Sequence, residues 1–102
     1  MFYGIKTGRQ VVGTPGTADL VIITLTDPQQ TKVKQLTLQA DPSNDGVIAI
    51  GGSTVVASET KGLSTGLVLT PDRDITILDC DITAIYFDGT NTTDSLIWFV
   101  QE

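Results

Sequence analysis

The sequence LTLQADPSNDGVIAI, residues 36–50, predicts a strand, a turn and a second strand. In its first part Leu36, Leu38 and Ala40 alternate with polar residues, which is the period of two of a strand with one buried face. Its centre, DPSNDG at residues 41–46, favours a turn, because proline fixes φ, asparagine and aspartate tolerate the left-handed region, and glycine accepts positive φ at no steric cost. Apolar residues return after the turn and continue the buried face.

Short extended segments bounded by turn residues recur along the rest of the chain. Strands are expected at 19–26, 33–40, 47–50, 53–58, 66–71, 75–78, 82–87 and 95–100. The run DLVIITLT at 19–26 is nearly continuously apolar, which is typical of a strand buried on both faces. No segment has a convincing helical period. Eight or so short strands with turns between them indicate an all-β sandwich or barrel.

The length of 102 residues corresponds to one domain. Residues 19–102 are expected to form a single β-sandwich domain, and residues 1–18 an extended N-terminal arm. In the arm, glycines and Pro15 interrupt the apolar positions. The arm could be the first strand of the domain, or it could lie on a neighbouring subunit or on another protein. The aromatic pair Phe2 and Tyr3 would be costly to leave exposed, so something is expected to cover it.

The net charge is −6 and is unevenly placed. Residues 74–102 hold six acids and no Lys or Arg. The chain has no basic stripe to neutralise phosphates, so we expect no nucleic-acid partner. The acidic segment could meet a basic partner, or it could simply keep the protein in solution. No stretch reaches the roughly 20 apolar residues of a membrane span, and the first residues do not resemble a signal peptide, so we expect no membrane partner.

Residues that could carry chemistry are few. The absence of histidine removes Ser-His and Cys-His pairs and most zinc sites. Cys80 lies between two aspartates that raise a thiol pKa, so it is expected to be a packed side chain. The paired acids that a glycosidase would need are Asp72 and Asp74, Asp79 and Asp81, and Asp88 and Asp94. All six are at expected turns, where aspartate is common for its local hydrogen bonds. We therefore expect no enzyme, cofactor or metal site.

The last strand places two aromatic residues side by side. Trp98 and Phe99 alternate along it, so one side chain lies on each face of its sheet. Both are expected in the core. The alternative is an exposed Trp98 at a subunit interface, where tryptophan is often a hot spot.

Four segments of this sequence match text that recurs, in the same order, in one group of proteins. They are LQADPSNDG at 38–46, IAIGGSTVVAS at 48–58, GLVLTPDRDITI at 66–77 and ITAIYFDGTNTTDSLIW at 82–98. With them, residues 33–101 resemble a group of small structural proteins of tailed-phage virions. The group includes capsid decoration (cement) proteins, head-fibre bases and tail-associated modules. The resemblance implies a jelly-roll-like antiparallel β-sandwich, often trimeric. It carries no binding residue over to this chain.

The function that the resemblance implies is structural. We expect a non-enzymatic capsid decoration module, made in the host cytoplasm, that binds the outside of the capsid and stabilises it through contacts between subunits. Its partners would be the major capsid protein and further copies of itself, as a homotrimer. The candidate partner-binding residues are Phe2, Tyr3, Lys6, Arg9 and Trp98. The two basic residues of this set could meet the acidic residues 74–102 of an adjacent copy.

An alternative function is a module of a tail or head fibre that binds glycan on the host surface. Such a module needs an exposed aromatic platform with polar neighbours. Tyr86 and Trp98 are the candidates for that platform.

Overall fold

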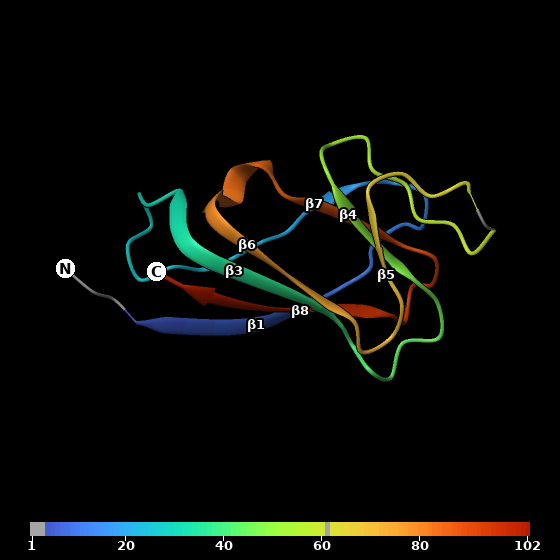
Figure 1. Cartoon of the computed structure of the whole chain (residues 1–102), viewed down its shortest axis with the longest axis horizontal. Helices are drawn as coiled ribbons and strands as arrows, with labels where there is room; N and C mark the ends of the chain where they lie inside the picture. The colour runs from blue at the N-terminus through green and yellow to red at the C-terminus, as the bar shows by residue number, and fades with distance from the viewer. Residues whose placement is uncertain (1–3, 61) are drawn as a thin grey trace.

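The computed structural model describes residues 4–60 and 62–102, and in this part of the chain eight strands form two four-stranded antiparallel sheets (Figure 1). The strands of the first sheet, in spatial order, are β1 (Ile5–Val11), β8 (Ser95–Gln101), β3 (Lys32–Ala40) and β6 (Asp74–Asp81). The strands of the second sheet are β2 (Asp19–Leu20), β7 (Tyr86–Gly89), β4 (Ile48–Gly51) and β5 (Leu67–Leu69). A 3₁₀ turn, η1 (Ile82–Ala84), lies between β6 and β7.

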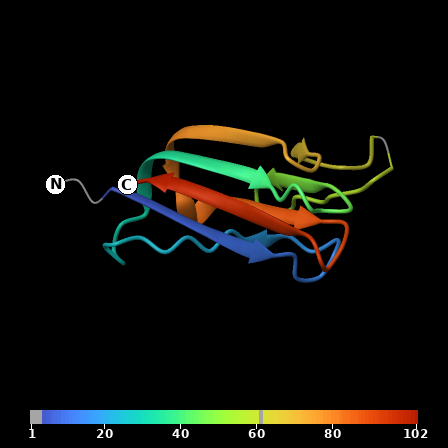
Figure 2. The same cartoon turned by 90° about the horizontal axis from the view of Figure 1, so that it is seen from below.

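The strand order identifies the topology. β1 pairs with β8, β2 with β7, β3 with β6 and β4 with β5, which is one long antiparallel hairpin wound into two sheets. This winding is that of a jelly roll with its two Greek keys. Figure 2 shows β1, β8 and β3 side by side along the length of the molecule. The expected jelly-roll-like β-sandwich is confirmed.

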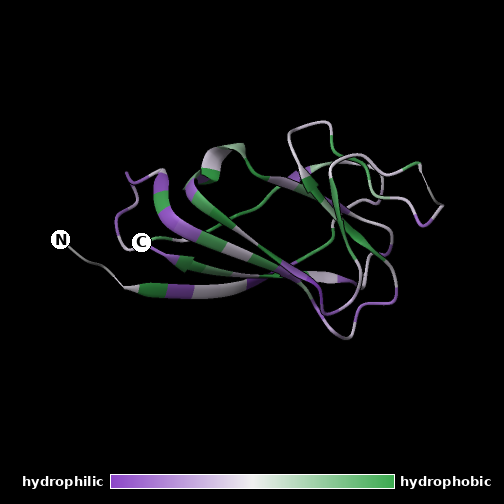
Figure 3. Cartoon of the chain, in the orientation of Figure 1, coloured by the Kyte–Doolittle hydropathy of each residue, from purple (hydrophilic) through white to green (hydrophobic). Residues whose placement is uncertain are grey.

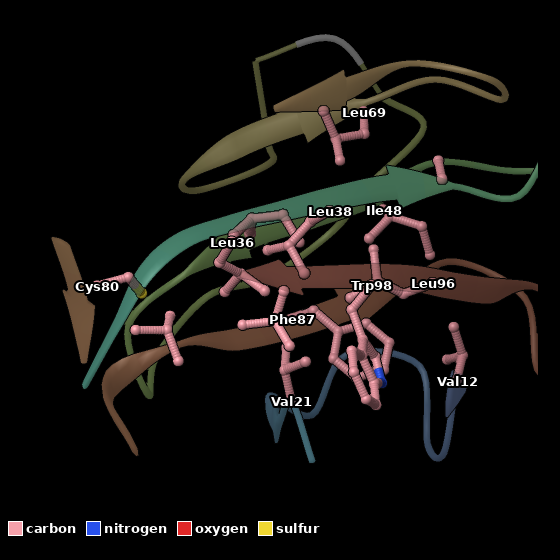
Figure 4. Packing of buried hydrophobic residues seen from close by; sticks show 14 of the residues in the cluster. Val12, Val21, Leu36, Leu38, Ile48, Leu69, Cys80, Phe87, Leu96 and Trp98 are labelled. Atoms are coloured by element: carbon pink, nitrogen blue, oxygen red, sulfur yellow. The ribbon is translucent and has the colours of Figure 1, made fainter. Parts of the chain in front are cut away.

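The core lies between the two sheets, and alternation of apolar and polar residues in the first sheet directs its apolar side chains there. Along β3, Leu36, Leu38 and Ala40 are buried while the residues between them are partly exposed, and Figure 3 shows the alternating hydropathy of this strand. Side chains of β8 lie beside them in the same sheet, and side chains of the second sheet meet them from the opposite direction (Figure 4). Phe87 and Ile48 are fully buried in this cluster. The strand–turn–strand predicted at residues 36–50 is therefore present as β3, the 41–46 turn and β4.

The predicted strand at 19–26 is wrong beyond its first two residues. Only Asp19 and Leu20 pair with β7, and the segment that follows is extended but lies in no sheet. Ile22 is exposed, and its amide donates to the Gln10 side chain at 2.7 Å instead of to a strand. The nearly continuous apolar run predicts burial on both faces, but the run lies at a sheet edge, where Ile22 is exposed.

The predicted strand at 53–58 is also wrong. Three consecutive amides there, of Val56, Ala57 and Ser58, donate to side chains of other segments, so they are not available to a sheet ladder. The acceptors are the Thr65 hydroxyl, an Asp88 carboxylate oxygen and the Ser64 hydroxyl. The segment is an irregular loop held by polar side chains.

The predicted strand at 82–87 begins instead with η1. Asp81 caps this turn by accepting a hydrogen bond from the Thr83 amide at 2.9 Å, and β7 starts only at Tyr86. The expected corner at 79–81 lies inside β6, where Asp79 has a φ of 50°.

The expected N-terminal arm supplies a strand of the sandwich. β1 pairs with β8 along its full length, from Ile5 opposite Gln101 to Val11 opposite Ser95. Of the two possibilities left open for this segment, the structure therefore favours the first strand of the domain. Residues 1–3 lie outside the described residues.

Candidate functional site

Five polar side chains are buried near the end of β7 and the start of β8. They are Asp41, Asn44, Asp88, Asp94 and Ser95. Within the described residues, every buried side-chain nitrogen or oxygen has a hydrogen-bond partner. Burial of a polar group costs free energy unless the group is hydrogen-bonded, so the stability of the fold depends on the hydrogen bonds of this cluster.

Asp41 begins the 41–46 turn and fixes its shape. Its Oδ1 accepts from the Ser43 amide at 3.0 Å and from the Ser43 hydroxyl at 2.8 Å. Its Oδ2 accepts from the Ser95 hydroxyl at 2.9 Å and forms an ion pair with Arg9 at 3.0 Å. The bonds from the Ser43 amide and hydroxyl, then that from Ser95, lower the pKa of the Asp41 carboxyl, and Arg9 adds to the shift.

Asn44 and Asp94 tie the same turn to β8. The Asn44 side chain donates to the Ser95 carbonyl at 2.9 Å and accepts from the Ser95 amide at 2.8 Å, as a neighbouring strand would. The Asp94 carboxylate accepts from the amides of Asp45 and Gly46, each at 2.9 Å. Because an ionised carboxylate is a strong acceptor, these bonds hold the tip of the turn firmly.

Asp88 ties together two further loops. Its carboxylate accepts from the Gly16 amide at 3.0 Å and from the Ala57 amide at 2.7 Å. One buried side chain on β7 thus fixes both the loop after β1 and the loop after β4. Sequence reasoning predicted local hydrogen bonds for these aspartates, but it did not find these long-range partners.

Of the six aspartates considered as candidate acid pairs, Asp72, Asp81, Asp88 and Asp94 accept hydrogen bonds within the fold. Asp88 and Asp94 are buried and bind backbone amides. Asp81 binds the amide and hydroxyl of Thr83, which lower its pKa. Asp72 accepts from the Gln39 side chain at 3.1 Å. Among the described residues, no three His, Cys, Asp or Glu side chains gather where they could hold a metal ion.

Cys80 is buried, as predicted. Burial raises the pKa of its thiol, and the charge of Asp81 raises it further. A protonated, inaccessible thiol is a poor nucleophile, so Cys80 contributes packing.

The two neighbouring aromatic residues of β8 have different environments. Trp98 is in the core, where its indole lies so close to Gly8 that a Cβ at that position would overlap it. Its side chain is therefore not part of a surface. Phe99 was expected in the core, but it is 38% exposed on the outer face of the first sheet. The reason is that, among residues 4–60 and 62–102, no further layer covers this face.

Two of the other candidate partner-binding residues lie at one edge of the first sheet. Lys6 and Arg9 are on β1 and are exposed, and Arg9 pairs within the chain with Asp41. Phe2 and Tyr3 lie outside the described residues. The acidic segment 74–102 does not form one surface, since Asp88 and Asp94 are buried. Partner contact through Lys6 and Arg9 stays a prediction.

An apolar groove lies beside the segment that follows β2. It has a volume of about 390 Å³ and runs between residues 20–31 and η1. Most of the side chains along it are aliphatic, among them Leu20, Ile22 and Ile82. The pattern of 19–26 predicted a buried strand here, so sequence reasoning missed this surface.

Comparisons with models of protein families, with curated proteins and with solved structures found no match. No helix in the described part of the chain is long and apolar enough to cross a membrane.

Proposed function

We propose that this chain is a non-enzymatic structural protein of a phage virion, a decoration module that binds the outside of the capsid, as a homotrimer, and stabilises it. The resemblance of residues 33–101 to such proteins supports this function, and so does the jelly-roll winding of the strands. The partners are the major capsid protein and further copies of the chain itself.

The observation that carries the proposal is that buried carboxylates hold the loops of the sandwich by hydrogen bonds. Asp41, Asp88 and Asp94 all accept hydrogen bonds from backbone amides and thereby fix the loops between strands. A decoration protein acts by many modest contacts repeated over symmetry-related copies. A body whose loops are already fixed loses little conformational entropy on binding, so more of each contact contributes to affinity.

The apolar groove beside residues 20–31 is the surface that we assign to the capsid. Exposed apolar surface rimmed by polar groups marks interaction sites on soluble proteins. Ile22 stands exposed at this groove, and its amide is already bonded to Gln10, so the side chain is presented in a fixed position.

The test is cosedimentation with capsids of the encoding phage from which the decoration protein is missing. We expect saturable binding in a fixed ratio to capsid subunits, and a higher melting temperature of the decorated shell. Ile22→Lys should weaken binding about tenfold or more, because it places a charge in an apolar contact. Leu63→Lys, an exposed leucine in another loop, is the matched control and should bind normally. A wild-type protein that stays in the supernatant would refute the proposal.

One observation favours the alternative of a glycan-binding module on a tail or head fibre. Phe99 is exposed between Thr7 and Thr37 of the neighbouring strands, so an aromatic ring lies among hydroxyl groups on an uncovered sheet face. Of the expected platforms, Trp98 is buried and Tyr86 is partly buried, so Phe99 takes their place. Under this alternative, host-surface glycans shift the NMR signals of the Phe99 ring, and Phe99→Ala abolishes binding while capsids are not bound.

A further inference from the structure

The first sheet has two open edges, β1 and β6. Each of these strands pairs with one neighbour in the described chain, β1 with β8 and β6 with β3. The outer side of an edge strand presents backbone amides and carbonyls that can pair with another strand. On the β1 side the adjacent edge, that of β2, is closed. The Gln10 side chain donates to the Leu20 carbonyl at 3.0 Å and accepts from the Ile22 amide. These are the backbone groups that a strand added beside β2 would bind, so another strand cannot pair there.

The register defines three rows of residues across the outer face of this sheet. The rows, each from β1 to β6, are Ile5, Gln101, Gln35, Leu78; then Thr7, Phe99, Thr37, Thr76; then Arg9, Ile97, Gln39, Asp74. The exposed ring of Phe99 shows which face this is, and the hydroxyls of Thr37 and Thr76 meet on it at 3.0 Å.

The two ends of these rows are complementary. Three successive antiparallel pairings separate β1 from β6, so the two strands run in opposite directions. A second copy that continues the sheet therefore brings its β1 antiparallel to β6 of the first. If the rows continue across the junction, Leu78 meets Ile5, Thr76 meets Thr7, and Asp74 meets Arg9. The three contacts are apolar with apolar, hydroxyl with hydroxyl, and acid with base.

We propose that copies of this chain associate by pairing β6 of one copy with β1 of the next, in this register. Each of the three side-chain pairs is a favourable cross-strand pair. Ile5 and Leu78 are 58% and 67% exposed, so both gain by being covered. The inference rests on the self-association in the proposed function and specifies its surface, but it does not depend on capsid binding.

Charged groups near the junction are compatible with this pairing. Arg9 already contacts Asp41, but its side chain is 60% exposed and its guanidinium has five N–H donors, so donors remain for Asp74 of the next copy. Lys6 of that copy lies diagonally across from Asp79, which is exposed. The contact is heterologous, since two different edges meet. Assembly therefore proceeds to a closed ring or to an open filament.

Light scattering behind size exclusion, over a range of protein concentrations, tests association. We expect the wild type to have a mass that is a multiple of 10.8 kDa. Leu78→Lys should raise the concentration at half-association about tenfold or more, because it removes the apolar pair. Leu63→Lys removes a leucine of similar exposure, 62%, from a loop and should leave the mass unchanged.

A charge exchange tests the pair at the other end of the rows. Asp74→Arg should dissociate the assembly, and Arg9→Asp combined with Asp74→Arg should restore it. Asp45→Arg makes the same change of charge on an exposed residue of the 41–46 turn and is the matched control. Since Arg9 also contacts Asp41, thermal melting of each variant shows whether the fold is intact.

Disulfide trapping tests the register itself. Directly opposed residues of an antiparallel pair have Cβ atoms about 4.5–5.5 Å apart, near the distance a disulfide requires. Copies carrying Ile5→Cys, mixed with copies carrying Leu78→Cys, should therefore cross-link under mild oxidation. Leu63→Cys mixed with Leu78→Cys should not.

The outcomes separate this inference from the proposed function. A wild type that stays at 10.8 kDa at every concentration, or an assembly whose mass neither Leu78→Lys nor Asp74→Arg reduces, would overturn the inference even if the protein binds capsids. Association with the expected cross-link would support the inference even if no capsid is bound.

Discussion

Replacing Asp94 by alanine should destabilise the fold by about 3–5 kcal/mol, counted from its hydrogen bonds. The Asp94 side chain is 1% exposed and accepts from the amides of Asp45 and Gly46, each at 2.9 Å. Alanine leaves both amides without this acceptor in a site that water does not readily reach. Each buried, unsatisfied donor costs about 1–3 kcal/mol, and bonds to a charged acceptor lie toward the upper end.

Two further variants separate the hydrogen bonds from other effects of the substitution. Asp94→Asn keeps the shape and one carbonyl oxygen, so it should lose about half as much stability as alanine. Asp45→Asn changes an exposed side chain on the same turn, while the amide that Asp94 binds remains. It should stay within about 0.5 kcal/mol of the wild type.

The assay is urea unfolding followed by tryptophan fluorescence, since the single tryptophan is buried in the core. A domain of this size is stable by about 5–15 kcal/mol, so the alanine variant should show a much lower midpoint at an unchanged slope. An alanine variant within about 0.5 kcal/mol of the wild type would refute the reasoning. So would an asparagine variant as damaged as the alanine variant, because the loss would then not follow the number of hydrogen bonds.

Three further predictions concern the core, acid stability and the thiol. Gly8→Ala should cost about 1–3 kcal/mol in urea unfolding, because its Cβ overlaps the buried indole, while Gly52→Ala, whose Cβ meets open space, should cost almost nothing. Hydrogen bonds from Ser43 hold the pKa of Asp41 below its ordinary 3.8, so this carboxylate adds stability above that pH and loses it as the pH falls through the folded value. The urea midpoint of wild type should therefore approach that of Asp41→Asn as the pH is lowered from about 6 to about 2. Buried Cys80 should react with a thiol reagent about a hundredfold slower in native protein than in urea, and equal rates would contradict its burial.

The fold was predictable wherever local chemistry and burial agree. At residues 36–50 the period of two, the turn formers and the returning apolar residues all indicate the same structure, and it forms. The expectations at 19–26 and 53–58 were wrong for a common reason. In both segments, backbone amides donate to side chains from distant parts of the chain, Gln10 in one case and Asp88 in the other. A local pattern cannot show a competitor that comes from elsewhere in the sequence.

The two aromatic residues of β8 show a second limit. Alternation correctly placed Trp98 and Phe99 on opposite faces, but it could not tell whether the second face is covered. Gly8 gives the indole its space, and that contact depends on the pairing of β1 with β8. The outer face is open because no third layer exists among the described residues.

The buried network shows why the resemblance indicates a fold more strongly than a role. Asp41, Asn44, Asp88 and Asp94 all lie within the recurring text, and each one fixes a loop of the sandwich. In this chain such residues hold the loops of the sandwich, whatever the protein binds.

Several of the proposed contact residues, though not Asp74 and Thr76, lie outside the recurring text. Ile5 and Ile22 precede residues 33–101 altogether, and Leu78 falls between two of the matching pieces. Surface positions of this kind can change without loss of the core, since each is exposed in the isolated chain. Two proteins that share the text can therefore share the sandwich and still bind different partners. Under the two proposals, the β1 and β6 edges and the groove make the contacts, so variants at these positions, not in the buried network, are the ones that distinguish a capsid protein from a fibre module.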